Sequence, residues 1–482
     1  MKRILVFMSL VFRGACTLGP DYKGPPDSAA GAPGGKFVRA DDPTFSASPA
    51  VSQWWESLND PALNSLVEEA LARSPNIEVA QARIKDARTQ ITSRQADMLP
   101  SLSANAVYLH ARLPGSALAG LTDSNSESSS SSSALNFYNL GTNASWEPDL
   151  FGGGRRGIEQ ARAALGQQFA ALADAQVSLS AQVAQAYVNL RDVQERARLN
   201  VQSAELQRRA LALTRQRHVA GTASALDVER LSSQLETTDA QNLPLAAQIA
   251  DYMDQLAVLT GHEPGTLDVN LSAATPVPLP PASIAIGDPA ALIAHRPDVR
   301  SAERVLAARY ASIGISEAKR FPSLRFTGIF GLGGSELRDV VNTDNFTALL
   351  VPTLSWSFVD FGKARAAVRQ SEAQRDEADA TYRQTVLDAL RDAESSLSRF
   401  GNVRLQLAQL ARAEATVARS VDLNNQRVKA GTSSLIDQLD IERQRYSAAI
   451  SVAQAKAQLT GAFISVNKAL GLGWTDESLA GR

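Results

Sequence analysis

The sequence predicts a mainly α-helical protein that also carries strands of a membrane β-barrel. Three observations predict this fold class. The second half of the chain repeats the first, each half holds a proline-free helical stretch of about 65 residues, and each half has two segments of about ten residues with alternating polarity. In 482 residues these features predict two similar structural units within one chain.

The internal tandem repeat is visible as matching segments at a constant offset. AGTASALDVERLSSQL surrounds Gly221 and AGTSSLIDQLDIERQR surrounds Gly431, about 210 residues later. Trp146 recurs as Trp356 at the same offset. Upstream, the segment from Ser74 matches the segment from Arg296 at an offset of about 222. The difference between the two offsets falls in one Ser-rich loop.

Composition excludes several functional classes. The net charge of −2 and the pI of about 6.2, without a sustained basic run, argue against a nucleic-acid partner. Four scattered His and one Cys exclude a Cys/His zinc site and an intrachain disulfide. No metal or other cofactor is expected, and no nucleophile elbow, phosphate loop or other catalytic constellation is present, so the chain is not expected to be an enzyme.

The N-terminus resembles a secretory signal. Met-Lys-Arg precedes the apolar run Ile4 to Phe12, which predicts a signal peptide over residues 1–15. Ala15-Cys16 resembles the cleavage site of bacterial lipoproteins, in which the Cys becomes the lipidated first residue, although Arg13 stands where an apolar residue is usual. The alternative is an ordinary signal with an incidental Cys. Residues 16–60 are expected to form an extended segment pinned by aromatic side chains.

Two very long helices are predicted. From 154 to 218 no proline interrupts the chain, and apolar residues spaced by four and three form a heptad seam. At 1.5 Å per residue such a helix is about 100 Å long. It ends at Gly221, returns as a helix to Thr260, and the second half repeats this pattern around Gly431.

Shorter helices are predicted over 62–97 and 288–319, each as one continuous element. The domain organisation that follows has repeat 1 over 61–272, a Pro-rich linker over 273–288, repeat 2 over 289–474 and a tail over 475–482. The segments between the helices are expected to gather into a belt at mid-height.

Four membrane strands are predicted, over 102–109, 137–146, 323–330 and 351–358. The alternative is two hairpins on a soluble sheet. Four strands are too few to close a barrel, and open edges are not viable in lipid, so the chain is expected to oligomerise. Three copies would supply twelve strands, although the sequence alone favours three copies over two only weakly.

Ordered motifs along the chain resemble the outer-membrane efflux channel family typified by TolC, in its lipoprotein branch with OprM and the NodT-like proteins. They are Cys16-Thr-Leu-Gly-Pro-Asp-Tyr22, Trp54-Trp55, Asn59-Asp-Pro-Ala-Leu63, Trp146-Glu-Pro-Asp-Leu-Phe-Gly152, Trp356-Ser-Phe-Val-Asp-Phe-Gly362 and Ala469-Leu-Gly-Leu-Gly-Trp474. The resemblance implies a homotrimer with a 12-stranded outer-membrane β-barrel and a long coiled-coil α-helical barrel through the periplasm. It implies a lipid-anchored exit duct that works with a periplasmic adaptor (membrane fusion) protein and an inner-membrane transporter of the RND type.

The two helix turns are the first candidate site. They would meet the adaptor, and both carry the same residue types: Arg217, Gly221, Ser224 and Asp227 recur as Arg427, Gly431, Ser434 and Asp437. The alternative is that these residues only cap helices, since Ser is a good N-cap residue.

The second candidate site is a constriction. Asp437 and Asp440 are spaced i, i+3 on one helix face, with Ile436 nearby. Family members close their tunnel at an apolar and acidic pair, which Ile436 and Asp440 match by spacing from Gly431. Repeat 1 has Arg230 at the place of Asp440, so the two turns are not equivalent. The alternative is an ordinary solvated face.

The function expected from the resemblance is passive export of small molecules such as drugs, driven by the partner transporter. A type I protein secretion duct is the alternative in the same class, and a non-conducting coiled-coil scaffold across the periplasm is the alternative in another class. Substrate choice resides in the transporter and is not encoded in this chain.

Overall fold

The chain is seen in a computed structural model that describes residues 17–25, 35–40, 42–49, 51–113 and 133–474. The predicted signal peptide, Cys16 and the tail 475–482 lie outside the described residues. The chain divides into two compact units. Unit 1 comprises Met1–Gly24, Lys85–Leu165 and Arg304–Ala380, and unit 2 comprises Pro25–Ile84, Gly166–Glu303 and Thr381–Arg482. Each unit therefore takes segments from both halves of the chain.

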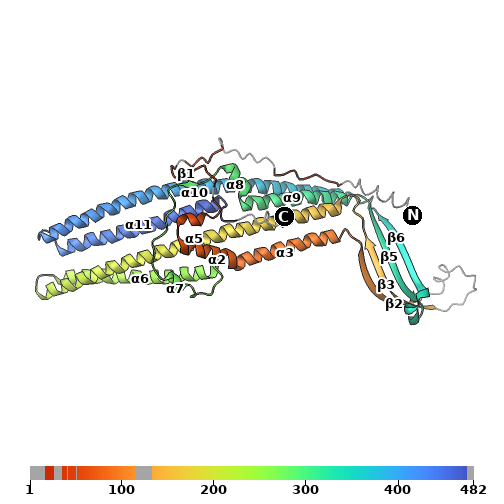
Figure 1. Ribbon diagram of the computed structural model, residues 1–482, viewed down its shortest axis with the longest axis horizontal. Coiled ribbons are helices and arrows are strands. Elements are labelled where there is room, and N and C mark those ends of the chain that lie inside the picture. Colours follow the sequence, from red (N-terminus) through yellow and green to blue (C-terminus); the bar gives the residue numbers. More distant parts are fainter. Residues whose placement is uncertain (1–16, 26–34, 41, 50, 114–132, 475–482) are drawn as a thin grey trace, which may run out of the picture. The chain divides into compact units, whose positions relative to one another are not determined.

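Unit 1 contains a four-stranded antiparallel sheet in the order β2-β3-β5-β6 (Figure 1). Its strands are β2 (Ser101–Leu113), β3 (Ser133–Trp146), β5 (Ser323–Gly334) and β6 (Phe346–Ser355). Two 3-10 helices, Leu337–Val341 and Thr343–Asn345, connect β5 to β6. β2 and β6 are the edges of the sheet, and neither has a second strand beside it among the described residues.

The strand bounds differ from the sequence prediction by more than one residue at five ends, including the start of β6, which lies at Phe346 and not at 351. β2 and β3 extend further than predicted, and Arg112 pairs with Ala134 in the added part. A hairpin ladder continues as long as the backbone groups face each other, whatever the side chains. β5 continues to Gly334, and β6 ends at Ser355, so the predicted strand residues 356–358 follow the sheet.

The sheet has one apolar and one more polar face. Residues paired across an antiparallel ladder share a face. The pairing therefore puts onto one face Leu102, Ala104, Ala106 and Tyr108 of β2; Tyr138, Leu140, Ala144 and Trp146 of β3; Phe326, Phe330 and Leu332 of β5; and Phe346, Ala348, Leu350, Pro352 and Leu354 of β6. The opposite face carries Ser, Asn and Thr at many of its positions, for example Asn143 and Thr353. The large apolar side chains of β6 are exposed.

The helices that the sequence analysis expected over 62–97 and 288–319 are each broken, and this corrects the prediction. The first divides into α2 (Pro61–Arg73) and α3 (Pro75–Ala96), and the second into α8 (Pro289–His295) and α9 (Pro297–Ala318). A proline clashes with a helical conformation in the residue before it. Ser74 accordingly has an extended conformation, with φ −64° and ψ 129°.

The long helices agree with the prediction to within about one residue at Gly154 and at His218. They are α5 (Gly153–Val219), α6 (Ala225–Leu259), α10 (Lys363–Lys429) and α11 (Leu435–Ala469). α5 and α10 have 67 residues each, and α6 and α11 have 35 each. The prediction of a mainly helical chain is thus confirmed. Among the described helices, none is both long and apolar enough to cross a membrane.

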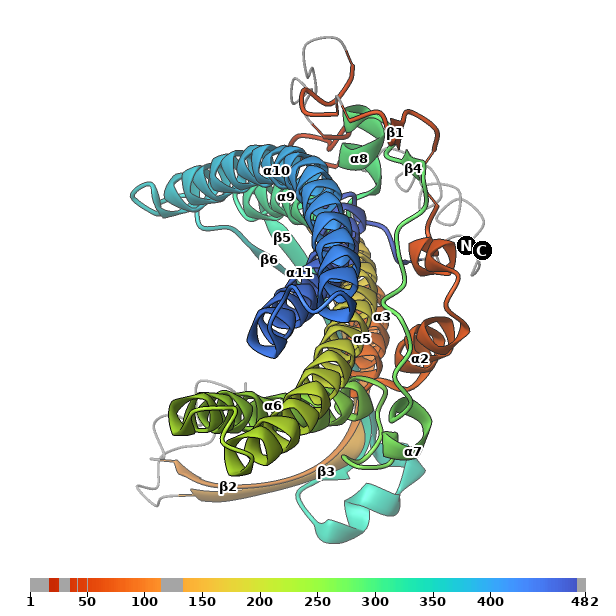
Figure 2. The ribbon, with the colours of Figure 1, turned by 90° about the vertical axis from the view of Figure 1, so that its left-hand side faces the viewer.

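The core of unit 2 surrounds the middle of α5. The seam residues Val183 and Leu190 are fully buried, and so are Ala184 and Val188, which lie off the seam. Burial of these off-seam positions exceeds what a two-residue heptad seam predicts. In Figure 2 the segments nearest the helix turns lie along an arc in the order α10, α11, α5, α6.

Non-helical segments of unit 2 pack against these helices. Trp54 and Trp55 begin a 3-10 helix (Trp54–Leu58), and both indoles are buried. Trp54 meets Phe463 edge-on, with ring centroids 6.0 Å apart. β1 (Phe45–Ser46) pairs in parallel with β4 (Ile284–Ala285), which lies in the Pro-rich linker, and α7 (Asp268–Leu271) precedes that linker.

Candidate functional site: the helix turns and the groove beside them

The turn between α5 and α6 is closed by a glycine in the left-handed conformation. Gly221 has φ +75°, and the next amide, Thr222 N–H, donates to the carbonyl of Arg217 at 2.8 Å. This is the six-residue closure that commonly ends a helix at glycine. A Cβ on Gly221 would meet no atom within 4 Å, so the backbone conformation and not crowding requires glycine here.

The turn between α10 and α11 has the same geometry. Gly431 has φ +72°, and Thr432 N–H donates to the carbonyl of Arg427 at 2.9 Å. Each turn has a further side-chain contact: His218 Nδ1 lies 2.9 Å from the carbonyl oxygen of Ala223 in the first, and the Arg427 guanidinium donates to the carbonyl of Thr432 at 3.3 Å in the second. The Ser433 hydroxyl donates to Asn424 Oδ1 at 2.8 Å across the hairpin.

Each return helix begins with a capping box. Ser224 Oγ lies 2.7 Å from Asp227 Oδ2 and accepts from Asp227 N–H at 3.1 Å. Ser434 and Asp437 repeat this arrangement at 2.8 Å and 3.1 Å. Such reciprocal bonds satisfy amides that a helix start leaves without partners. The capping role that the sequence left open for these four residues is therefore present in both turns.

The capping bonds also act on the charge of the carboxylates. Hydrogen bonds from the Ser224 hydroxyl and backbone hold the pKa of Asp227 below 3.8. Those from Ser434 do the same for the pKa of Asp437, with a smaller contribution from the Arg427 cation. A hydrogen bond to the ionised form favours that form. Both carboxylates are therefore charged over the physiological pH range.

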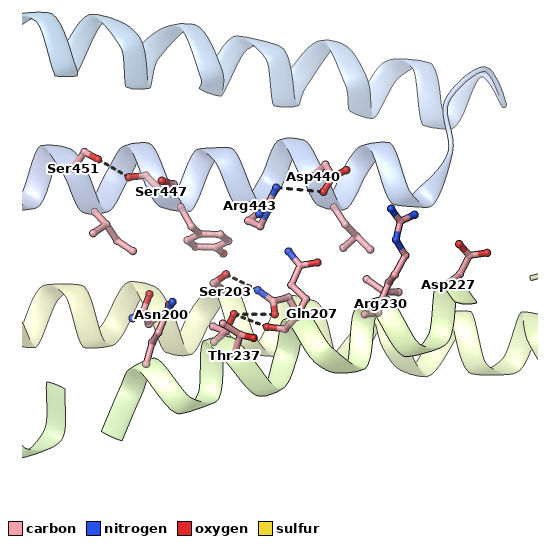
Figure 3. Close-up of a pocket in the computed structure, with 17 residues that line it drawn as sticks. Asn200, Ser203, Gln207, Asp227, Arg230, Thr237, Asp440, Arg443, Ser447 and Ser451 are labelled. Carbon is pink, nitrogen blue, oxygen red and sulfur yellow. Dashed lines mark hydrogen bonds and ion pairs between the residues drawn. The ribbon is translucent and has the colours of Figure 1, made fainter. Parts of the chain in front are cut away.

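A polar groove of about 760 Å³ lies beside the turns, between α11 and the α5–α6 hairpin (Figure 3). Its walls include Asn200, Ser203 and Gln207 of α5, Arg230, Gln234 and Thr237 of α6, and Asp440, Arg443, Tyr446 and Ser447 of α11. Arg230 extends from α6 toward α11 in Figure 3. The α11 residues recur every three or four positions, so helical periodicity identifies them as one stripe. Among the described residues, no group of His, Cys, Asp and Glu fits a metal ion.

The three residues of the expected constriction have different surroundings. Asp440 lies in the groove wall and is more than half exposed, with its carboxylate 3.8 Å from the Arg443 guanidinium. Asp437 is bound in the capping box of α11 and does not line the groove. Ile436 falls in the first turn of α11, and its side chain lies outside the described residues. Within one chain, the structure therefore does not bring Asp437 and Asp440 into one cluster.

The segment that follows Cys16 is held by a buried arginine in unit 1. The Arg156 side chain is 3% exposed and donates to the carbonyls of Leu18 and Gly19, at 3.0 Å each, and to Asp21 Oδ1 at 2.7 Å. Gly19 approaches Gly314 so closely that an added Cβ would lie 2.5 Å from the Gly314 Cα. Sequence reasoning missed this clamp, because its partners are about 135 residues apart.

Comparisons with known proteins agree over almost the whole chain. A family model described as outer membrane efflux protein matches residues 66–262 and 289–472. The chain is 29% identical over 482 residues to the pyoverdine export outer membrane protein OpmQ of Pseudomonas aeruginosa, a match that covers 99% of this chain and 98% of OpmQ. It is 28% identical over 477 residues to the solvent efflux pump outer membrane protein SrpC of Pseudomonas putida, covering 98% of each. The solved outer-membrane channel OprN superposes with a TM-score of 0.85 at 31% identity, over 95% of this chain and 100% of OprN.

Proposed function

Because the chain belongs to the outer membrane efflux protein family, we propose that it is the outer-membrane exit duct of a tripartite efflux pump. It would passively export small molecules delivered by a periplasmic adaptor and an inner-membrane transporter of the RND type. The family resemblance inferred from the sequence is confirmed, and the relatives OpmQ and SrpC carry names that refer to export and efflux. The observation that carries the proposal is the sheet of unit 1, with its apolar face and its two open edges.

That sheet supports assembly of three copies. An open edge in lipid leaves backbone N–H and C=O groups without partners, which costs several kcal/mol per group, so only closed barrels are viable. Four strands are too few, because small closed barrels have about eight or more. Three copies would form a twelve-stranded barrel in the outer membrane, with the apolar face toward lipid and the more polar face lining the duct.

The helices support a tandem duplication that continues this symmetry into the periplasm. α10 and α11 repeat the lengths of α5 and α6, and each bound lies 210 residues after its counterpart. α3 and α9 are likewise both 22 residues long. Three chains would then place six similar helix hairpins around a helical barrel, with repeat 1 over 61–272 and repeat 2 over 289–474.

The two turns are proposed as the surface that the adaptor contacts. They are exposed, their backbone is fixed by Gly221 and Gly431, and Arg217 and Arg427 provide cations beside them. Asp440 is proposed to form, with Asp437 and Ile436, the constriction of the duct at this end. Arg230 and Arg443 near Asp440 would limit the repulsion between three copies of that carboxylate.

Cys16 is proposed as the lipidated first residue of the mature protein, which would add an acyl anchor in the outer membrane. The Arg156 clamp supports this proposal, because it ties the residues directly after Cys16 to the unit that holds the sheet. One acyl chain gives only marginal membrane binding, so the barrel would supply the main hold and the lipid would aid delivery.

The proposal is tested by native mass spectrometry in detergent and by recording in a planar bilayer. The expected results are a trimer and stepwise ionic conductance. A stable monomer would contradict the exit duct, and a trimer without conductance would favour the non-conducting scaffold instead.

A further inference from the structure

We propose that β6 of one copy pairs antiparallel with β2 of the next copy in one defined register, with Trp356 opposite Ala104, and that Phe361 packs against Leu99 of that next copy. This inference rests on the proposed trimer and specifies how its chains join. It is derived from the strand pairing that already joins the two halves of a single chain, which we call the inner seam.

The seam within the chain is the pairing of β3, from the first half, with β5, from the second half. Its register places Trp146 opposite Phe326, and the two rings stack at 5.9 Å. Just beyond the strands, Phe151 stacks on Phe321 with ring centroids 4.9 Å apart and planes 21° apart. These contacts show how the second strand of one half joins the first strand of the other.

A conserved internal hydrogen bond fixes which residues correspond in the two halves. Trp146 Nε1–H donates to the carbonyl of Met98 at 3.0 Å, and Trp356 Nε1–H donates to the carbonyl of Arg320 at 3.1 Å. Trp356 follows Trp146 by 210 residues, and Arg320 follows Met98 by 222. β6 is therefore the counterpart of β3, and β2 is the counterpart of β5.

Applying these two offsets to the residue pairs of the inner seam gives the pairs expected between the open edges of two copies. The pair Trp146–Phe326 becomes Trp356–Ala104, and the pair Phe151–Phe321 becomes Phe361–Leu99. Within the chain Phe361 is fully exposed and Leu99 is 65% exposed, whereas Phe151 and Phe321 stack on each other and Phe321 is 41% exposed. Phe361 and Leu99 are thus exposed apolar side chains at the positions that correspond to the stacked pair Phe151 and Phe321. An interface between copies of one chain requires such exposed apolar surface.

The backbone of Phe361 differs from that of its counterpart Phe151. Phe361 has a φ of +50°, a left-handed conformation that is unusual for a bulky side chain and that Phe151 does not share. Such strain persists where the surroundings over-determine it. The described part of the chain places nothing over Phe361, so in this proposal a contact from the next copy holds it.

The transferred register also keeps the faces of the sheet continuous. It sets Leu354 opposite Ala106 and Pro352 opposite Tyr108, so that the apolar face runs from chain to chain. A slip of one residue would turn one apolar face against a polar face.

A charge pair across the inner seam has a neutral counterpart in the proposed register. The Arg325 guanidinium contacts the Glu147 carboxylate at 2.9 Å, between β5 and the end of β3. The corresponding residues at the open edges are Ser103 and Ser357. Both partners of the ion pair are replaced by neutral hydroxyls, so the register leaves no unpaired charge at this pair of positions.

The register is tested with pairs of cysteines. Thr353→Cys is combined in turn with Asn105→Cys, Val107→Cys and Leu109→Cys, of which the register places only residue 107 directly opposite. Directly opposite Cβ atoms lie about 5 Å apart and diagonal ones about 7–8 Å, and a disulfide needs about 4 Å. Within one chain, β6 and β2 are three strand spacings, about 14 Å, apart, so a disulfide must join two chains.

The matched control is Asn143→Cys with Ile329→Cys, the corresponding pair inside the chain. It should form an intrachain disulfide, seen as a mass loss on intact-mass analysis, under the same oxidation. The expected result is a covalent trimer on non-reducing gels for the 353–107 pair and for neither neighbour. A trimer by native mass spectrometry that links through 353–105 or 353–109, or through none of the three, would overturn the register and leave the exit duct intact. A monomer would overturn both.

The aromatic contact is tested by a double-variant cycle. Phe361→Ala and Leu99→Ala should each lower the fraction of trimer that survives mild SDS, and the double variant should lose no more than the more damaging single variant. Phe361→Leu, which keeps an apolar side chain, should retain most of the trimer. Additive losses, or a Phe361→Ala trimer as resistant as the wild type, would overturn the contact.

Discussion

Replacing Gly431 by proline should open the second helix turn, and the geometry of the turn gives the free-energy cost of the change. Gly431 has φ +72°, whereas proline is fixed near −65°. The change also removes the Gly431 N–H that donates to the carbonyl of Val428 at 3.0 Å. It further disfavours the helical conformation of Ala430, the residue before it. Together these effects should cost about 3 kcal/mol or more, which is roughly a 100-fold increase in the opening equilibrium.

The assay is hydrogen–deuterium exchange of the peptide that spans Gly431 and Thr432. Gly431→Asn is the matched control, because asparagine tolerates the left-handed conformation and an added Cβ meets open space. Its exchange should rise by less than about tenfold, since the conformation is preserved. Similar exchange in the proline and asparagine variants would refute the reasoning. If the turn contacts an adaptor, Gly431→Pro and a bulky change at Gly221 should also impair efflux while the trimer and its outer-membrane location persist, and wild-type drug resistance would count against that contact.

Asp437→Ala with Asp440→Ala should raise single-channel conductance and weaken block by multivalent cations, and an unchanged conductance and block would make both residues ordinary surface charges. Asp437→Ala alone should also loosen the start of α11, seen as faster hydrogen exchange there, whereas Asp440→Ala alone should leave that start intact. Because hydrogen bonding lowers the folded-state pKa of Asp227 and Asp437 below 3.8, their capping stability is present above about pH 4 and is lost as the pH falls through the folded-state pKa. Exchange at the turns, corrected for its intrinsic rate, should therefore be constant from about pH 7 to about pH 5, and a loss of protection within that range would contradict the capping role. Cys16→Ser should reduce delivery to the outer membrane without abolishing the channel, and intact-mass analysis of the wild type should find an acylated Cys16 at the mature N-terminus, not an unmodified one or a different start.

The long helices and their turns were predictable because their signals are local. An unbroken heptad pattern defines α5, and a glycine that must take a positive φ marks its end at Gly221. The breaks at Ser74 and Arg296 were missed because apolar periodicity continues across them, although the following prolines could have located them. The far ends of β2 and β3 were missed because backbone pairing, which side-chain alternation does not report, extends the ladder to Leu113 and Ser133.

The candidate site likewise has features that the sequence predicts and features that only the packed structure shows. Ser434 and Asp437 are three residues apart, so their capping box is readable as a short motif. The groove beside Asp440 is not, because Gln207 and Arg443 come from helices more than 200 residues apart and meet only through packing. The proposed role of Asp440 at a constriction depends on other copies of the chain, which no contact within one chain reports.

The clamp around Arg156 has a consequence for how the N-terminal segment tolerates change. Two of its three contacts with that segment are to backbone carbonyls, of Leu18 and Gly19, which every amino acid provides. The clamp therefore makes no demand on the Leu18 side chain, whereas Thr17 lies against Gly152 and Gly19 is fixed by its close approach to Gly314. Inserting or deleting one residue between Cys16 and Gly19 would shift Cys16, the proposed lipidation site, along the clamp by about 3.5 Å. A lipoprotein leader grafted onto this protein to test the proposed lipidation would therefore need to preserve the spacing of this segment more than its composition.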